Sequence, residues 1–501
     1  MPPDATRLLL RLIVASALVR VAFAGAVGLS VDESYTVAIS RHFAWSYFDH
    51  PPLHVWLVGA WAHLLRSEQP LLMRLPDIVM FAASTAVLYR LTTRCYGERA
   101  GLWAAAAFNL APVFTLNTAG GVLPDGPLVL FSLLAVSCFA QAVRLPAPDP
   151  TARARMLAAG APGGLALLSK YTAVFPLLAL AAYLPMCRPR WLREQATWLA
   201  AAIALGLFTP VLVWNATHGW TSFAFQGSRA LPGGVSLARA ALEFAGQLLY
   251  LFPWLAALLL WALLRALRRG RADPAGWLFA TLAAGPIAAF TLVGLWATVL
   301  PHWPAIGWLF ALPLAGPLLA DLARRRPRLV HGSTAATALL LVGTITLVAL
   351  QTATGVLGRI VPALAAHDPT LDLLDWRALG EAAARWQLRE RGLFIATVSW
   401  IDAGKSDYAL GGSLPVLCLS EDPRQFGLLH DVRTFTGRDA LIVAAAGRPD
   451  WLALAAPQFR RVVPGEDLVV RRRDGEAALT LHTAFGYGYV PPEGARAPYG
   501  R

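Results

Sequence analysis

Long apolar stretches, separated by connectors rich in arginine, constrain the fold of this chain more than any other feature of its sequence. Hydrophobic residues make up 56% of the 501 residues and charged residues only 15%, whereas soluble domains carry roughly 25% charged residues. A membrane-crossing helix needs roughly 20 mostly apolar residues. We therefore predict an all-α polytopic membrane domain over residues 1–355, with about eleven transmembrane helices near 8–29, 71–90, 100–117, 123–143, 155–169, 171–187, 196–214, 239–265, 276–298, 304–321 and 332–353.

The positions of the arginines predict how this domain is oriented. Arginine is concentrated in every second connector, at 90–99, 144–155, 188–193, 265–271 and 324–328. Connectors rich in Lys and Arg remain in the cytoplasm, so we predict a cytoplasmic N-terminus in a multi-pass protein of the bacterial inner membrane. The pair 155–169 and 171–187 is short for two spans, and one interrupted element is an alternative.

The first outer connector, residues 30–70, is long for a simple link between two helices. Its segments 33–45 and 53–66 have apolar faces that include aromatic residues. We expect both segments to be juxtamembrane helices that lie along the outer membrane surface.

After about residue 365 the charge rises and the long apolar runs stop. Residues 376–391 have the pattern of an amphipathic helix, and three short apolar runs have the pattern of buried strands, at 393–399, 415–419 and 440–446. We predict a small periplasmic α/β domain over 365–490, followed by a disordered tail at 491–501. A polar cluster in this domain is a candidate for shaping acceptor choice, and a solvated loop explains it equally well: Trp400, Asp402, Lys405, Asp407 and Tyr408.

The first outer connector also carries the strongest candidates for catalysis. Asp32 and Glu33 follow the first apolar stretch, and Asp49-His50-Pro51-Pro52 follows later. Two prolines fix an extended corner that can begin a helix, so a carboxylate and an imidazole are held there rigidly. Such carboxylates suit a general base and an orienting partner. The alternative for Asp32 is that it caps the helix after it.

Further candidates lie in the other outer connectors. Asp125 stands at the membrane surface, where an ionisable side chain is costly and indicates function, although a helix cap is the alternative. Lys170, next to Tyr171, is one of only two lysines in the chain and lies on the side where cations are scarce, so a lipid phosphate is its expected partner unless it simply snorkels to the interface. Arg229, in an aromatic segment, and His302 are placed to meet an anion.

Several soluble chemistries are not supported by the sequence. It has no Walker loop, no dinucleotide fingerprint after a strand, no zinc-binding His-Glu-x-x-His and no serine elbow. The four cysteines suggest neither a disulfide framework nor a zinc cluster. Without a nucleotide cradle, a nucleotide sugar is not the expected donor for any sugar transfer.

The outer motifs, in this order, resemble those of the bacterial GT-C glycosyltransferases of the protein-mannosyltransferase superfamily. The closest resemblance is to the branch with the lipid A aminoarabinose transferase and the rhizobial lipopolysaccharide galacturonosyltransferases. It covers roughly residues 8–355 and rests on five motifs: Asp32-Glu33, Tyr47-Phe48-Asp49-His50-Pro51-Pro52-Leu53, Leu123-Pro124-Asp125, Leu168-Ser169-Lys170-Tyr171 and Pro301-His302-Trp303.

The resemblance implies a sugar on a polyprenyl phosphate as donor, an outer glycolipid such as lipid A or lipopolysaccharide core as acceptor, and inversion at the sugar. It implies that Asp32 is the general base, with Glu33 and Asp49 as the other catalytic candidates. Substrate-binding candidates are His50, Asp125, Lys170, Tyr171, Arg229 and His302. His50 departs from the aminoarabinose transferase, which has lysine there, so phosphate binding does not carry over directly.

We expect no cofactor and no obligatory metal, and the partners are membrane lipids, the donor and the acceptor, with no nucleic acid. Two alternatives remain open from the sequence. A protein O-glycosyltransferase would use the same class of donor. A lipid or sugar transporter would also be polytopic, but transporters usually show internal repeats and ionisable residues in mid-helix.

Overall fold

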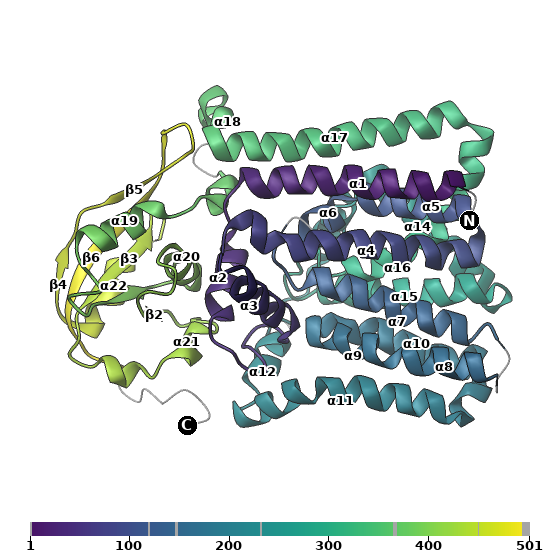
Figure 1. Cartoon of the computed structure of the whole chain (residues 1–501), viewed down its shortest axis with the longest axis horizontal. Coiled ribbons are helices and arrows are strands. Elements are labelled where there is room, and N and C mark those ends of the chain that lie inside the picture. Colours follow the sequence, from purple (N-terminus) through teal and green to yellow (C-terminus); the bar gives the residue numbers. More distant parts are fainter. Residues whose placement is uncertain are drawn as a thin grey trace.

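The computed structural model consists of a bundle of long helices with an α/β domain at one end of it (Figure 1). The N-terminus lies at the opposite end of the bundle (Figure 1). The structure describes residues 3–118, 121–145, 149–230, 233–363, 368–448 and 450–492. The tail predicted to be disordered, 491–501, lies outside the described residues except for its first two.

Seven helices in the described part of the chain are long and apolar enough to cross a membrane, which makes this a multi-pass membrane protein. They are α1 (Pro3–Ala26), α4 (Pro70–Tyr96), α7 (Asp125–Ala142), α11 (Gln195–Thr217), α15 (Pro274–Val293), α16 (Ala305–Arg325) and α17 (Pro327–Thr354). The chain also forms shorter helices outside the α/β domain: α5 (Glu98–Leu110), α6 (Pro112–Thr118), α8 (Pro150–Ala158), α9 (Gly160–Ser169), α10 (Val174–Cys187), α12 (Thr221–Ser228) and α18 (Val356–Ile360).

The predicted count of eleven spans is not confirmed, and the differences occur where backbone chemistry interrupts an apolar run. The run 239–265 forms two helices, α13 (Leu237–Leu249) and α14 (Pro253–Arg269), which meet at 105°. Phe252 has φ 65° and Pro253 cannot continue a helix hydrogen-bond ladder, so the chain turns there. The run 100–117 breaks before Pro112 for the same reason. Counting the bent pair as one span gives eight.

The segment 155–187 forms two helical stretches that meet at Lys170, and the chain before and after it lies together, since Arg188 donates to the carbonyl of Val143. Helix α9 ends at Ser169, Lys170 is extended with φ −157°, and one 3-10 turn leads into α10. Lys170 lies at the end of the bundle next to the α/β domain. The evidence is that Lys170 lines a cavity together with residues of that domain.

Two short helices of the first connector separate the bundle from the α/β domain (Figure 1). They are α2 (Val31–Ser40) and α3 (Leu53–Leu65). The turn between them carries Phe43 and Trp45, which are 70% and 59% exposed and contact Trp56 of α3. Exposed aromatics of this kind suit a membrane interface.

The α/β domain contains one six-stranded mixed sheet with the order β2-β1-β3-β6-β4, and β5 pairs with β6. Strand β1 pairs in parallel with β2 and β3, whereas β6 is antiparallel to its neighbours. The bounds are β1 (Phe394–Thr397), β2 (Val416–Cys418), β3 (Ala440–Ala445), β4 (Phe459–Pro464), β5 (Leu468–Arg471) and β6 (Ala477–Tyr489), with helices α19 (Arg377–Arg385), α20 (Trp400–Ala409), α21 (Phe426–Leu429) and α22 (Trp451–Ala455).

Helix α20 fixes this domain to α2 through buried contacts. A Cβ on Gly404 would lie 2.9 Å from Cα of Tyr35, so the two backbones approach as closely as only glycine permits. Lys405 Nζ donates to the carbonyls of Leu29 at 2.6 Å and Leu374 at 3.0 Å. Asp407 pairs with Arg41. The polar cluster of residues 400–408 is therefore a buried helix, and the solvated-loop interpretation is wrong.

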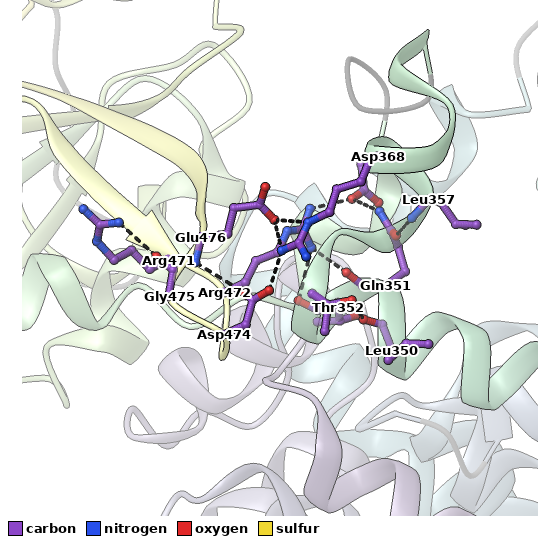
Figure 2. A network of polar contacts seen from close by, with 12 residues as sticks. Leu350, Gln351, Thr352, Leu357, Asp368, Arg471, Arg472, Asp474, Gly475 and Glu476 are labelled. Atoms are coloured by element: carbon purple, nitrogen blue, oxygen red, sulfur yellow. Dashed lines mark hydrogen bonds and ion pairs between the residues drawn. The ribbon is translucent and has the colours of Figure 1, made fainter.

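A second contact joins the end of α17 to the β5–β6 hairpin (Figure 2). Arg472 ion-pairs with Asp368 at 2.7 Å and donates to the carbonyls of Gln351 and Thr352. Arg359 pairs with Glu476 at the rim. These contacts, which include a buried charge network, hold the domain over the bundle.

Candidate active site

A cavity of about 430 Å³ lies where the bundle, the first connector and the α/β domain meet. Its wall combines carboxylates, cations, imidazoles and aromatic rings. Its lining residues are Val31, Asp32, Tyr35, Thr36, Asp49, His50, His54, Leu123, Pro124, Asp125, Lys170, Tyr171, Thr172, Gln226, Arg229, Ala230, Phe290, Val293, Leu300, His302, Trp303, Trp400 and Arg424.

Eight of the nine candidate residues line this one cavity, although they come from segments up to 270 positions apart. They are Asp32, Asp49, His50, Asp125, Lys170, Tyr171, Arg229 and His302. Their catalytic or binding roles remain predictions. The ninth residue, Glu33, does not line the cavity.

Glu33 is buried beneath the cavity in an ion pair with Arg74 of α4. The two carboxylate oxygens accept from Arg74 at 2.7 and 2.6 Å, and also from the backbone amides of Val122 and Ser30. Burial alone raises the pKa of Glu33, but Arg74 and these amides outweigh it and hold the pKa below its usual value. A carboxylate held in this way is a poor base, and its contacts join α2 to α4.

Asp32 is the carboxylate that opens into the cavity. Ser30 is the N-cap of α2 and forms a capping box with Glu33, so Asp32 falls within the first turn and is not the cap. Within the described part of the chain, no side chain donates a hydrogen bond to its carboxylate. Asp32 is exposed to solvent in the cavity, but desolvation by the surrounding cavity walls, aided by the neighbouring Asp49, raises the pKa of Asp32 to about 6. This carboxyl is accessible and basic enough to accept a proton near neutral pH.

Asp49 is held on three sides and is less available than Asp32. Its carboxylate accepts from the Tyr35 hydroxyl at 3.1 Å and pairs with Arg424 at 3.3 Å. Its carbonyl accepts from Gln226 at 2.6 Å. These contacts join three other segments of the chain to Asp49 at this corner.

Lys170 is paired rather than isolated, contrary to the sequence interpretation. Its Nζ contacts both carboxylate oxygens of Asp125, at 3.0 and 2.8 Å. Asp125 is the first residue of α7, but the structure gives it this cation as partner. The neighbouring Tyr171 hydroxyl lies 2.6 Å from that of Ser222, which ties the interruption after α9 to α12.

The imidazoles and Arg229 form the rest of the polar wall. Burial, reinforced by the positive charge of Lys170, lowers the pKa of His50 to about 3 and that of His302 to about 4. Both rings are therefore neutral near pH 7, and each can donate one hydrogen bond. The Arg229 guanidinium lies over the ring of Trp303, 4.3 Å from its centroid. Within the described residues it has no carboxylate partner, so it presents a full charge to the cavity.

Two lining residues that sequence reasoning did not select as site residues come from the α/β domain. Trp400 was noted only as part of the polar cluster, and Arg424 was not noted at all. Arg424 has φ 51°, an uncommon conformation for a residue other than glycine, but a sequence does not reveal this. The buried Arg74 was also missed, although an arginine inside an apolar stretch is a visible signal.

Comparison with known proteins supports the resemblance seen in the motifs. Residues 49–214 match the family described as dolichyl-phosphate-mannose-protein mannosyltransferase. Lipid A galacturonosyltransferase RgtD of Rhizobium johnstonii is 25% identical over 279 residues, which cover 54% of this chain. The matched region spans 57% of that relative, little more than half of its length.

Solved structures confirm the fold along nearly the whole chain. ArnT from Cupriavidus metallidurans bound to undecaprenyl phosphate has a TM-score of 0.65 at 19% identity, over 95% of this chain and 97% of that one. Its apo state has a TM-score of 0.61 at 17% identity, over 96% and 98% of the two chains. The predicted helical membrane domain with a small α/β domain is thus confirmed, as is the similarity to the bacterial GT-C branch.

Proposed function

We propose that this chain is an inverting glycosyltransferase that moves a sugar from a polyprenyl-phosphate carrier to a glycolipid acceptor on the periplasmic side of the inner membrane. One observation carries the proposal. The accessible carboxylate of Asp32 shares a cavity with Arg229, Lys170 and His302, at the end of a helical membrane bundle. Transfer of a sugar from a lipid phosphate requires a base and an anion-binding wall in one cavity at the membrane surface.

In the proposed reaction, Asp32 accepts the proton of an acceptor hydroxyl. The acceptor oxygen forms a bond to the anomeric carbon from the face opposite the phosphate, and the bond between that carbon and the phosphate oxygen breaks. The electron pair leaves with polyprenyl phosphate, and the anomeric centre is inverted. General base catalysis of this kind contributes roughly 10²–10⁴-fold to a rate.

Negative charge develops on the leaving phosphate, so preorganised cations and donors stabilise the transition state. Arg229 supplies a full charge, because no carboxylate among the described residues pairs with it. Lys170 shares its charge with Asp125, so the phosphate competes with that carboxylate for Nζ. His302 and His50, both neutral, contribute hydrogen bonds. The leaving group carries one phosphate rather than a chelating diphosphate, so the reaction proceeds without a cofactor or an obligatory metal.

The nature of donor and acceptor is supported by the relatives. An ArnT structure with the same fold is bound to undecaprenyl phosphate, and the named activity of RgtD is on lipid A. We therefore favour lipid A or a related outer glycolipid as acceptor. A protein hydroxyl acceptor is the second candidate, because the matching family is described as a protein mannosyltransferase.

The test compares purified wild type with Asp32→Asn. Each is given polyprenyl-phosphate-linked sugars and lipid A, and both polyprenyl phosphate release and the mass of the glycolipid are followed. We expect release with a matching mass gain in wild type, and a rate at least about 100-fold lower in Asp32→Asn. Asp467→Asn, an exposed aspartate of the α/β domain, is the matched control and should behave as wild type.

Each of the other outcomes would show which part of the proposal is wrong. Release that persists in Asp32→Asn would keep the enzyme class but move the base to Asp49. Release with transfer only to protein would favour the second candidate. A folded wild type that releases nothing from any carrier would refute the proposal and favour a transporter.

A further inference from the structure

Only two side chains of the α/β domain line the cavity within the described residues, those of Trp400 and Arg424. Trp400 begins α20, the helix that packs on α2. Arg424 stands just before α21. The domain thus completes the cavity wall with one aromatic ring and one guanidinium.

Arg424 is held in place without using all of its hydrogen-bond donors. Its guanidinium lies between two rings, 4.5 Å from the Trp400 centroid and 4.9 Å from that of Phe225, so both domains clamp it. Nη1 contacts Asp49 at 3.3 Å and Nε contacts Asp422 at 3.1 Å. In the part of the chain that the structure describes, Nη2 donates to no acceptor.

The backbone of Arg424 supports a specific role. Its φ of 51° is unfavourable for a side chain with a Cβ, and the next residue secures the turn. The Gln425 amide donates to the Tyr35 hydroxyl at 3.0 Å, and its side-chain oxygen accepts from the Phe48 amide at 2.8 Å. The loop is therefore built to hold this guanidinium at the cavity.

Arg424 lies beside the carboxylates at the base end of the cavity. It pairs with Asp49 at 3.3 Å, and Asp49 and Arg424 are the two charges that most affect the pKa of Asp32. In an inverting transfer the base and the leaving phosphate lie on opposite faces of the sugar. The contact with Asp49 therefore places Arg424 near the base, on the acceptor side.

We propose that Arg424 binds an anionic group, a phosphate or a carboxylate, on the head group of the glycolipid acceptor, so that the α/β domain selects the acceptor. This inference rests on the proposed function and deepens it. A guanidinium presents a planar fork that matches phosphate and carboxylate, and a ring-clamped one loses little freedom on binding. The acceptor hydroxyl is then delivered beside Asp32.

The experiment measures KM and kcat for bisphosphorylated lipid A and for a phosphate-free glycolipid of the same acyl content. It compares wild type, Arg424→Gln and Arg424→Lys, with Arg385→Gln as control, an exposed arginine of the same domain. A hydrogen bond to a charged group contributes about 1.5–3 kcal/mol, which corresponds to roughly 10–150-fold in KM. We expect Arg424→Gln to raise KM for bisphosphorylated lipid A by that factor, with kcat within about threefold, and Arg424→Lys to lie between.

Three results would overturn the inference. A rise in the KM of a sugar donor that carries a carboxylate, with no change for the acceptor, would place the anion on the donor. An equal loss with both acceptors, reproduced by Asp49→Asn, would mean that Arg424 acts only by holding Asp49. Unchanged KM in folded Arg424→Gln would mean that it binds no anion.

A direct binding measurement tests this inference independently of the proposed function. Bisphosphorylated lipid A is titrated into detergent-solubilised wild type and Arg424→Gln, and the bound fraction is read by native mass spectrometry. Weaker binding to the variant supports the inference even if wild type releases no polyprenyl phosphate, in which case only the proposed function fails. Equal binding refutes the inference whether or not the enzyme is active. Equal thermal midpoints of the two proteins control for folding.

Discussion

The raised pKa of Asp32 should make the reaction sensitive to acid in a range where an ordinary aspartate would not be. Burial, then Asp49, raises the pKa of Asp32 to about 6, and a general base works only when ionised. The ionised fraction then falls from about 90% at pH 7 to about 10% at pH 5. We expect kcat/KM to fall about tenfold over this range. With the ordinary pKa of about 3.9, the loss at pH 5 would be below about 10%.

The assay is a kcat/KM profile from pH 4.5 to 8, measured as polyprenyl phosphate release at subsaturating donor. This parameter reports the free enzyme, and the donor phosphodiester stays a monoanion throughout. Two variants move the inflection in opposite directions. Asp49→Asn removes a negative neighbour and should shift it to lower pH. Arg424→Gln removes a positive neighbour and should shift it to higher pH.

A profile that stays flat from pH 7 to 5 would refute the assignment of Asp32 as a desolvated base. So would an acid limb that is identical in Asp49→Asn and Arg424→Gln, because the inflection would then belong to another group.

The remaining predictions concern stability, the anion wall and metals. Arg74→Met leaves Glu33 buried and unpaired and should lower the free energy of unfolding in detergent by about 3–5 kcal/mol, more than Glu33→Gln does; equal effects would argue against the buried pair. Lys405→Met removes the donor to two buried carbonyls and should speed proteolysis between the bundle and the α/β domain, whereas unchanged cleavage would mean that α20 does not depend on it. Lys170→Met should lower kcat more than Asp125→Asn, since only the first removes a cation from the phosphate; the reverse order would contradict this role for Lys170. Activity should survive EDTA, and loss reversed by one divalent ion would contradict metal-free transfer.

Local patterns in the sequence predicted most of the architecture. Apolar length predicted the helical membrane domain, and the change in composition after residue 365 predicted the α/β domain, with β1, β2 and β3 close to the expected runs. Both signals are local, because hydropathy and periodicity depend on neighbours within a few turns of chain. The count of spans was less secure, since a single proline, as at Pro253, divides an apolar run without changing its hydropathy.

The candidate residues were recognisable because acids and cations at the ends of apolar stretches are costly and need a purpose. That argument found Asp32, Asp125 and Lys170, but it could not distinguish Asp32 from Glu33. Only the tertiary structure does so, because Arg74 lies 41 positions further along the chain and neutralises one of the two. The largest separation between two paired groups of the site is that of Arg424 and Asp49, which are 375 positions apart in the chain. The sequence by itself determined which chemical groups stand at the ends of the apolar stretches. Folding decided their partners, because Coulombic and hydrogen-bond energies depend on distance in space and not on separation along the chain.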